Sequence, residues 1–244
     1  LRESANRAKE SILDEAVKLF AEKGFDGTTV NEIANKAQVN KALIYYYFDN
    51  KADILDYLVQ FLLENVANIT IDYIHLTIEN MVAEGTLTIH PDRLHFTDRA
   101  AVRHFIDTIN RYYRQVLDYA LEHRKIIRII MLESLKQNEY CVDLFKMLDY
   151  TSGGESRLYK TVSKFERSFT YSDDLDLYRL FFLLIPLLNF AAYFDEYRAV
   201  AQVSEQELKD SFMRSFRLVI SSIASGSDIL LRNVNHSERG NDVS

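Results

Sequence analysis

The sequence has few of the residues on which disulfide-linked, zinc-bound or sheet-rich folds depend. Its 244 residues include one cysteine, two prolines, seven glycines and no tryptophan. The lone Cys141 excludes a disulfide framework and a cysteine-rich zinc module. Few glycines and prolines leave too few turns for a many-stranded sandwich or barrel, whereas 48% hydrophobic residues suffice for a sizeable core. We therefore predict an all-α fold.

A segment typical of membrane insertion is lacking as well. The first ten residues, LRESANRAKE, contain no apolar signal segment, and the longest apolar run, residues 180–194, includes Pro186 and Asn189. That run of about 15 residues is shorter than the roughly 20 that a bilayer-spanning helix needs. We expect no membrane partner and a cytoplasmic location.

Excess positive charge is also absent. The chain has 29 basic and 36 acidic residues and a formal net charge of −7. Residues 1–51 are neutral, with eight basic and eight acidic groups, so the whole negative charge lies in residues 52–244. The N-terminal fifth is a separate electrostatic region that permits binding to nucleic acid without demanding it.

Three short helical segments are predicted in residues 11–48. Residues 11–23 place apolar side chains on one face and end at Gly24, which can take the left-handed conformation of a helix C-cap. Thr29-Val-Asn-Glu32 has the form of a capping box and predicts a second helix from Val30. Residues 41–48 predict a third helix, after a tight connection.

The third helix has an unusual outer face. Ile44 and Phe48, four residues apart, provide an inward anchor. The groups left pointing largely outward are Lys41, Leu43, Tyr46 and Tyr47. Such a face is expected where a surface meets another molecule, but tyrosines that lie around a small core would give the same pattern.

Four motifs in residues 28–55 keep a fixed spacing across these helices. They are Thr28-Thr-Val-Asn-Glu-Ile-Ala34, Ala37-Gln-Val-Asn-Lys41, Ile44-Tyr-Tyr-Tyr-Phe48 and Asn50-Lys-Ala-Asp-Ile-Leu55. Together, over about 50 residues, they resemble the N-terminal signature of the TetR family of bacterial repressors. The sequence departs from that signature at Gln38, where glycine is usual, at Leu43, where threonine is common, and at Tyr46, where histidine is common.

The resemblance implies a helix-turn-helix domain in residues 1–51 that binds double-stranded operator DNA. On the matching positions it implies DNA contacts by Thr28, Thr29, Asn40, Lys41, Leu43, Tyr45, Tyr46, Tyr47 and Lys51. The tyrosine hydroxyls, Lys41 and Lys51 are suited to phosphates, and Leu43 is suited to a thymine methyl group. It further implies a dimeric regulator, a repressor that a ligand releases from DNA.

The rest of the chain shows helical pattern without motifs. A long helix is expected from the Asn50 cap, residues 86–97 as a loop or short extended segment, and helices at 98–124, 125–138, 156–170, 174–200 and 204–225, with a further one to Tyr150. Residues 52–225 form the predicted effector-binding and dimerisation domain, and residues 226–244 a polar tail. The apolar character of residues 174–225 suits a homodimer interface or a larger intramolecular core, and the resemblance favours the homodimer.

Aromatic residues gather in the larger predicted domain. At helical spacing they are most often core, but the resemblance implies an effector cavity that they could line. Pro186 removes a helical hydrogen bond and predicts a kink, beside which Asn189 either satisfies the freed backbone or contacts a ligand. We expect a small hydrophobic or aromatic effector among Phe105, Tyr112, Phe182, Asn189 and Tyr193.

Signatures of catalysis are missing. The sequence has no glycine-rich phosphate loop, no nucleophile elbow and no His-Glu-x-x-His pair, and its six histidines are scattered. We expect no enzyme, no catalytic residue, no cofactor and no metal site. The alternative to a regulator is an enzyme without DNA binding or a helical protein-interaction module, and the neutral charge of residues 1–51 and Leu43 favour the interaction module.

Overall fold

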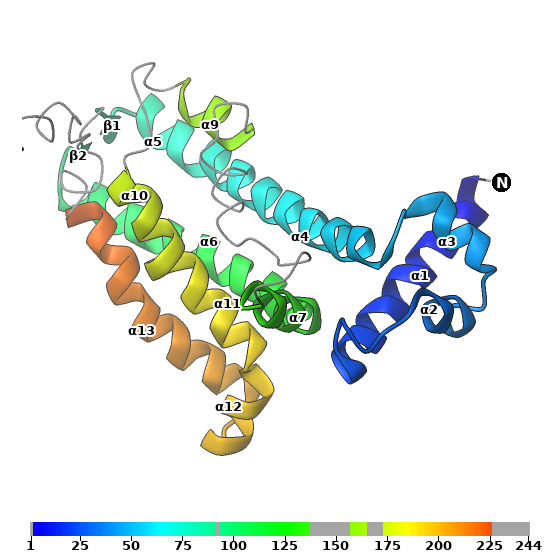
Figure 1. Cartoon of the computed structure of the whole chain (residues 1–244). Coiled ribbons are helices and arrows are strands. Elements are labelled where there is room, and N and C mark those ends of the chain that lie inside the picture. Colours follow the sequence, from blue (N-terminus) through cyan, green and yellow to red (C-terminus); the bar gives the residue numbers. More distant parts are fainter. Residues whose placement is uncertain (1, 91–92, 137–156, 165–172, 226–244) are drawn as a thin grey trace, which may run out of the picture. The chain divides into compact units, whose positions relative to one another are not determined.

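The computed structural model describes residues 2–90, 93–136, 157–164 and 173–225. Helices make up nearly all of this part of the chain, and a short hairpin is the exception (Figure 1). The predicted all-α class is therefore confirmed. Several predictions lie outside the described residues: the helix to Tyr150, much of the helix at 156–170 and the polar tail.

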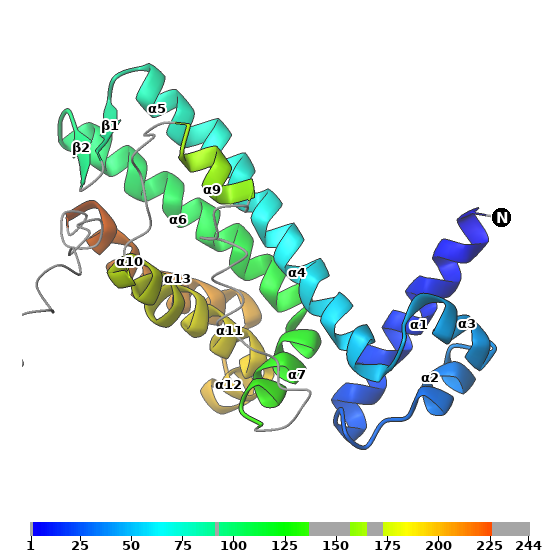
Figure 2. The same ribbon diagram turned by 45° about the horizontal axis from the view of Figure 1, so that its top comes forward.

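Figures 1 and 2 show the described helices and the two strands from two directions. The helices are α1 (Arg2–Lys23), α2 (Val30–Lys36), α3 (Lys41–Tyr47), α4 (Lys51–Tyr73), α5 (Glu79–Ala83), α6 (Arg99–Glu122), α7 (Arg124–Ser134), α9 (Arg157–Val162), α10 (Asp173–Tyr178), α11 (Ile185–Ala192), α12 (Phe194–Ala201) and α13 (Glu205–Ser225). Two π-helical turns, η1 (Ile74–Ile78) and η2 (Arg179–Leu184), join helices that would otherwise be continuous. The strands are β1 (Leu87–Ile89) and β2 (Leu94–Phe96).

The chain divides into two compact units. The first contains Leu1–Val66, Asp118–Leu144 and Leu188–Tyr197, and the second contains Ala67–Leu117, Phe145–Leu187 and Arg198–Ser244. Helices α4, α6, α11 and α12 each contribute to both units. The sequence-based boundaries at residues 51 and 225 stay a prediction.

The first unit has a core built around α1. Ile12, Ala16 and Phe20 of α1 are buried together with Ile33 of α2 and Ile44 of α3. Helix α7 packs against α1 and contributes a row of buried isoleucines at positions 126, 127, 129 and 130. The helix-turn-helix region thus shares its hydrophobic core with a helix that the sequence pattern places far along the chain.

The second unit contains the hairpin and the long C-terminal helix. Leu87 of β1 and Met81 of α5 are buried, and β1 pairs antiparallel with β2, Leu87 lying opposite Phe96. The expected extended segment at 86–97 is confirmed. In α13, Met213, Phe216 and Ile220 form the buried stripe.

The expected helices differ from the observed ones in several places. Helix α1 begins at Arg2, before the expected start at residue 11, and α7 ends at Ser134, before the expected end at residue 138. The sequence leaves open where the fourth helix ends, at the β-branched run Ile69-Thr70-Ile71 or at Gly85. In the structure the helical stretch continues through η1 and α5 to Ala83, and Gly85 follows with a φ of 71°. The single helix expected over 174–200 is interrupted at Tyr193 and carries the π-helical turn η2 just before Pro186. A π-turn is a common way to accommodate a proline that cannot donate a backbone hydrogen bond.

Two helical stretches in the described part of the chain are long and apolar enough to cross a membrane by length and composition. They are Lys51–Ala83 and Asp174–Ala192, with 22% and 33% of their apolar windows buried. The second is longer than the run read from the sequence because the helix begins before Leu180. Core helices of soluble proteins meet the same criteria, so this is weak evidence for a membrane span.

Candidate nucleic-acid interface

The turn between α1 and α2 is fixed by local hydrogen bonds. Gly24 has a φ of 77°, in the left-handed region that glycine favours, and its carbonyl accepts a hydrogen bond from the Thr28 hydroxyl at 2.9 Å. Phe25 and Thr28 are each 1% exposed. The Thr28 side chain therefore holds the turn and does not face outward.

Helix α2 begins at the predicted capping box. The Thr29 amide donates to Glu32 Oε2 at 2.9 Å, and the Glu32 amide donates to Thr29 Oγ1 at 3.3 Å. Lys23 Nζ also donates to Glu32 Oε1 at 2.6 Å. The hydrogen bond from Lys23, followed by those from Thr29, lowers the pKa of Glu32 to about 2. Glu32 is therefore ionised at neutral pH, and through Lys23 it links the first turn of α2 to the C-terminal end of α1.

The turn between α2 and α3 is strained at one residue. Gln38 has a φ of 56°, a left-handed conformation that costs a non-glycine residue roughly 1 kcal/mol or more. Flanking hydrogen bonds hold it there, including one from the Val39 amide to the Ala34 carbonyl at 3.0 Å. Gln38, at the position where the TetR signature usually has glycine, therefore adopts the left-handed conformation that glycine favours.

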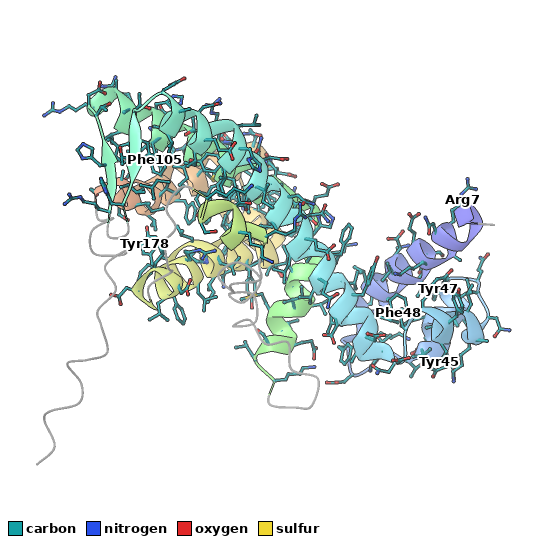
Figure 3. The ribbon with its side chains drawn as sticks, turned by 90° about the horizontal axis from the view of Figure 1, so that it is seen from above. Arg7, Tyr45, Tyr47, Phe48, Phe105 and Tyr178 are labelled. Atoms are coloured by element: carbon teal, nitrogen blue, oxygen red, sulfur yellow. The ribbon has the colours of Figure 1, made fainter. Side chains whose placement is uncertain are left out.

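Helix α3 presents polar and aromatic side chains on a buried anchor. Asn40 Oδ1 accepts from the Ala42 amide at 3.0 Å and caps the helix, while Ile44 is fully buried and Phe48 is 3% exposed. On the outer face Tyr46 is 77% exposed and Tyr45 48% exposed. Figure 3 labels Tyr45, Tyr47 and Phe48 among the N-terminal helices.

The other outer positions of α3 are less uniform. Lys41 is exposed, with its ammonium 5.5 Å from the centre of the Tyr45 ring, while Leu43 and Tyr47 are half-buried. The Tyr46 and Tyr47 rings meet edge to face at 5.0 Å. The face thus combines one cation, tyrosine hydroxyls and one aliphatic side chain, a set that can bind phosphates and contact base edges.

Lys51 has an internal role that the sequence does not reveal. Its ammonium donates to the carbonyls of Phe25 at 2.6 Å and Thr28 at 2.9 Å, and lies 3.4 Å from that of Asp26. It also lies 4.4 Å from the centre of the Phe25 ring. Its three N–H groups are therefore directed at the α1–α2 turn.

The structure thus separates the predicted contact residues by what their side chains do. Thr29, Lys41, Tyr45 and Tyr46 are exposed, and Leu43 and Tyr47 are half-buried beside them. The Thr28, Thr29, Asn40 and Lys51 side chains hydrogen-bond to the backbone and fix the turns or the starts of α2 and α3, and of these Thr29 and Asn40 are also exposed.

Lys9 is a residue of this region that the sequence analysis missed. Its ammonium lies 3.8 Å from the centre of the Tyr57 ring, 5.5 Å from that of Phe48 and 6.0 Å from that of Tyr47. It therefore links α1 to the end of α3 and to α4. No local sequence signal points to it, because these rings lie 38 or more positions along the chain.

The residues predicted to bind an effector lie in different surroundings. Phe105 is 3% exposed and packs on Phe96 at 5.2 Å, and Phe182 is 57% exposed and stacks on Tyr178 at 5.6 Å. Tyr112 lines a pocket in the second unit.

Asn189 and Tyr193 belong to the first unit. Asn189 Oδ1 accepts a hydrogen bond from the Tyr197 hydroxyl at 3.1 Å, so its side chain pairs with another side chain and not with freed backbone. Tyr193 is 40% exposed, and the guanidinium of Arg128 lies 5.4 Å from the centre of its ring.

Comparison with known proteins agrees with this N-terminal geometry. Residues 12–58 match the family model of the bacterial regulatory proteins of the tetR family. The biofilm operon icaADBC HTH-type negative transcriptional regulator IcaR is 51% identical over 43 residues in Staphylococcus aureus strain Newman and 49% identical over 43 residues in Staphylococcus epidermidis. These matches cover 18% of this chain and 23% of each relative, so the chain spans less than a quarter of the relatives' length.

The fold extends the similarity beyond the matched segment. A crystal structure of a TetR family transcription regulator from Marinobacter aquaeolei VT8 superposes with a TM-score of 0.55 at 13% identity, covering 90% of this chain and 98% of that one. Residues 12–58 thus match the tetR-family model, and the fold of the chain is similar to that of this TetR family transcription regulator. The matched family and relatives are transcriptional regulators and not enzymes.

Proposed function

We propose that the chain is a dimeric transcriptional regulator, a repressor, which binds double-stranded operator DNA through α3 and is released by a small effector. The observation that carries this proposal is the outer face of α3, where Tyr46 is 77% exposed on a helix anchored by fully buried Ile44. A tyrosine so exposed contributes little to the core of its own domain, although its ring contacts Tyr47. The IcaR relatives, which are negative regulators, support repression over activation.

In the proposed interface, outer residues contact the DNA and inner residues hold the turns in place. Lys41 and the hydroxyls of Tyr45 and Tyr47 donate to phosphate oxygens, while Leu43 meets a thymine methyl group and Tyr46 contacts base edges. Thr29 lies at the start of α2, and its exposed side chain contacts the DNA backbone. Thr28, Asn40 and Lys51 contribute by fixing the α1–α2 turn and the start of α3.

The proposed homodimer uses the helices within residues 174–225. Leu177, Phe181 and Leu218 in the second unit are 48%, 48% and 77% exposed. Side chains this apolar are seldom so open in clusters unless they form an interface. A symmetric dimer would present two α3 helices to half-sites about one helical turn apart, roughly 34–36 Å.

The proposed effector acts on the DNA-binding equilibrium. Of the residues predicted from the sequence to meet it, Phe105, Tyr112 and Phe182 belong to the second unit, and Tyr112 lines a pocket there. Release requires that the effector bind the DNA-free arrangement more tightly than the DNA-bound one, because equal affinity would shift nothing. A regulator of this kind works in the cytoplasm, where bacterial DNA is located.

The direct experiment selects sequences from random DNA duplexes with the full chain and then measures affinity over a salt series. A DNA-binding regulator enriches a two-part site and loses affinity steeply with salt, because phosphate binding releases counterions. A protein-interaction module or an enzyme without DNA binding enriches no sequence and shows no such salt dependence. Tyr46→Ala, which leaves the buried anchor intact, is the control for contact through α3.

A further inference from the structure

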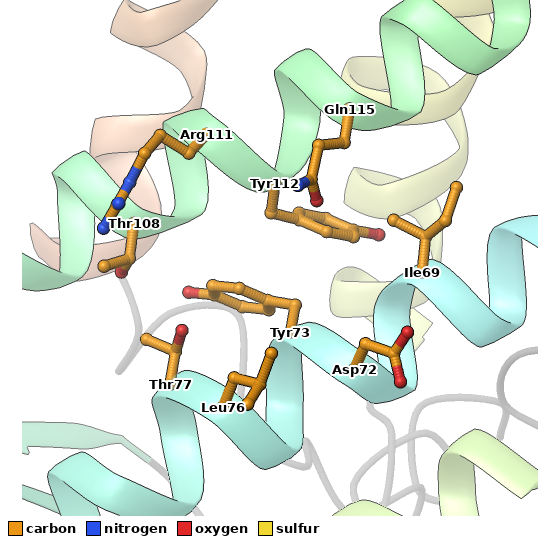
Figure 4. Close-up of a pocket in the computed structure, with 9 residues that line it drawn as sticks. All are labelled: Ile69, Asp72, Tyr73, Leu76, Thr77, Thr108, Arg111, Tyr112 and Gln115. Atoms are coloured by element: carbon orange, nitrogen blue, oxygen red, sulfur yellow. The ribbon is translucent and has the colours of Figure 1, made fainter.

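A pocket lies between α4 with η1 and α6 in the second unit (Figure 4). Its volume is about 570 Å³, within the range of roughly 300–1,000 Å³ typical of small-molecule sites. The lining residues are Ile69, Asp72, Tyr73, Leu76, Thr77, Thr108, Arg111, Tyr112 and Gln115. Of the predicted effector residues, Tyr112 is the one that lies among them.

The central part of the pocket is aromatic. The rings of Tyr73 and Tyr112 stack with centres 4.9 Å apart and planes inclined by 26°. A hydrogen bond of 2.8 Å between the hydroxyls of Thr70 and Tyr112 ties α4 to α6 beside the pair. Leu76 remains 74% exposed at the edge of the pocket. An aromatic ring that covers Leu76 and the tyrosine pair would bury this open apolar surface.

One end of the pocket is suited to an anion. Figure 4 shows the Arg111 side chain beside Thr108, with the Tyr73 hydroxyl pointing toward them. Burial raises the pKa of Tyr73, so its phenol stays protonated and can donate. The Tyr73 oxygen is buried near Thr108 but lacks an acceptor in regular hydrogen-bond geometry. A carboxylate bound by Arg111 would offer that acceptor after a small ring movement.

The other end carries a negative charge. Asp72 is exposed and lies, in Figure 4, on the side away from the Arg111 guanidinium and nearer Ile69. Neither Asp72 nor Arg111 forms an ion pair with another residue in the described part of the chain. The pocket therefore presents one available positive group and one available negative group, separated by an aromatic floor.

The backbone at the pocket is irregular in a way that is uncommon for structural helices. Leu76 and Thr77 belong to η1, a π-helical turn within the long helical stretch that begins at Lys51. Such turns are rare and occur frequently at functional sites, because they displace side chains from the regular helical positions. This is an observation separate from the lining chemistry.

We propose that this pocket is the effector site and that its ligand is a small zwitterionic aromatic compound, with an anionic group bound by Arg111 and a cationic group bound by Asp72. The inference rests on the proposed regulator function and makes the effector more polar than the hydrophobic ligand expected from the sequence. In this proposal the ligand contacts α4, the helix that begins at Lys51, and Lys51 hydrogen-bonds to the α1–α2 turn.

The test uses three probes that share one ring: 4-(aminomethyl)benzoate with both charges, benzoate with the anion and benzylamine with the cation. Binding to the full chain is measured by calorimetry without DNA. The zwitterion is expected to bind about tenfold or more tightly than either singly charged probe. Equal affinities for all three probes, or no binding of the zwitterion at millimolar concentration, would overturn the proposal.

Two variants assign the charges within the site. Arg111→Met should reduce the affinity for the zwitterion to about that for benzylamine, and Asp72→Asn should reduce it to about that for benzoate. Both side chains are exposed, so the thermal midpoint should stay near that of the wild type. Arg103→Met on α6 and Glu64→Gln on α4 are matched controls that should change no affinity. Loss of binding in the controls, or none in the site variants, would contradict the assignment.

The measurement distinguishes this inference from the regulator proposal. If the chain selects a DNA sequence but discriminates no probe, the regulator proposal stands and the pocket assignment is wrong. If it binds the zwitterion through Arg111 and Asp72 but no DNA, the regulator proposal is wrong. If both hold, adding the zwitterion should weaken operator binding in the wild type and leave it unchanged in Arg111→Met.

Discussion

Replacing Lys51 with methionine separates two roles that this residue can have. The sequence resemblance makes it a phosphate contact, whereas the structure directs its ammonium at the α1–α2 turn, 2.6 Å from the Phe25 carbonyl and 2.9 Å from the Thr28 carbonyl. Methionine keeps most of the apolar chain and removes only the charge and the donors. We predict that Lys51→Met destabilises the first unit and leaves the salt dependence of DNA binding unchanged.

The expected loss of stability follows from the two short bonds. Hydrogen bonds to charged groups contribute about 1.5–3 kcal/mol each where they are buried, and an exposed cation over a ring adds about 0.5–1 kcal/mol. Lys51 is half-buried, so water replaces part of this interaction, and about 2 kcal/mol is a reasonable total. For a chain of this size, that lowers the thermal midpoint by roughly 4–8 °C.

The assay combines urea unfolding, followed by circular dichroism, with DNA affinity over a salt series. Lys41→Met is the matched comparison, because Lys41 is exposed and has no carbonyl partner in the described residues. It should keep wild-type stability and make the salt slope shallower by about one unit, as expected for one lost phosphate contact. A Lys51→Met variant with wild-type stability and a slope shallower by one unit would refute the structural role.

Four further predictions concern other parts of the chain. Leu218→Arg should give a monomer by sedimentation, whereas Leu76→Arg, at an equally exposed leucine outside residues 174–225, should stay dimeric; a dimeric Leu218→Arg would place the interface elsewhere. Tyr46→Ala should change which duplexes are selected, and an unaltered preference would remove it from base contact. The pKa of Glu32 is lowered from 4.5 to about 2, so its stabilising effect is complete above pH 4.5 and is lost toward pH 2. In urea titrations, the difference in stability between the wild type and Glu32→Gln should therefore vanish as the pH falls over that interval. Phe182→Ala should cost well under the roughly 3–5 kcal/mol of a buried phenylalanine in urea unfolding, because the ring is 57% exposed, and a loss within that range would contradict this reasoning.

Local signals are sufficient to predict the helix caps and turns of residues 24–41. The Thr29 capping box, the Asn40 cap and the left-handed Gly24 each depend on residues within four positions, so their geometry is written into short stretches of sequence. A second capping box, Ser204 with Glu207, has the same pattern and begins α13, and it too can be recognised from the sequence alone. Helix positions were accordingly easier to predict than helix interruptions.

Contacts between distant segments could not be predicted in the same way. The Lys51 ammonium meets the Phe25 carbonyl 26 positions away, and the pocket joins residues near 73 to residues near 112. Their formation depends on how helices pack, which a hydrophobic pattern leaves open. The π-turn at η1 is a further example, since no residue type within it signals the change from regular helix.

The measurement that tests the central claim most directly is the affinity of the full chain for its selected duplex as salt is raised. If α3 and its surroundings bind operator DNA, the logarithm of the association constant falls linearly with the logarithm of salt concentration, by about 0.9 for each phosphate contact. Tyr46→Ala should weaken this binding without changing the slope, because a phenol hydroxyl neutralises no phosphate. An affinity that is independent of salt, or one that is equal for selected and random duplexes, would contradict the account.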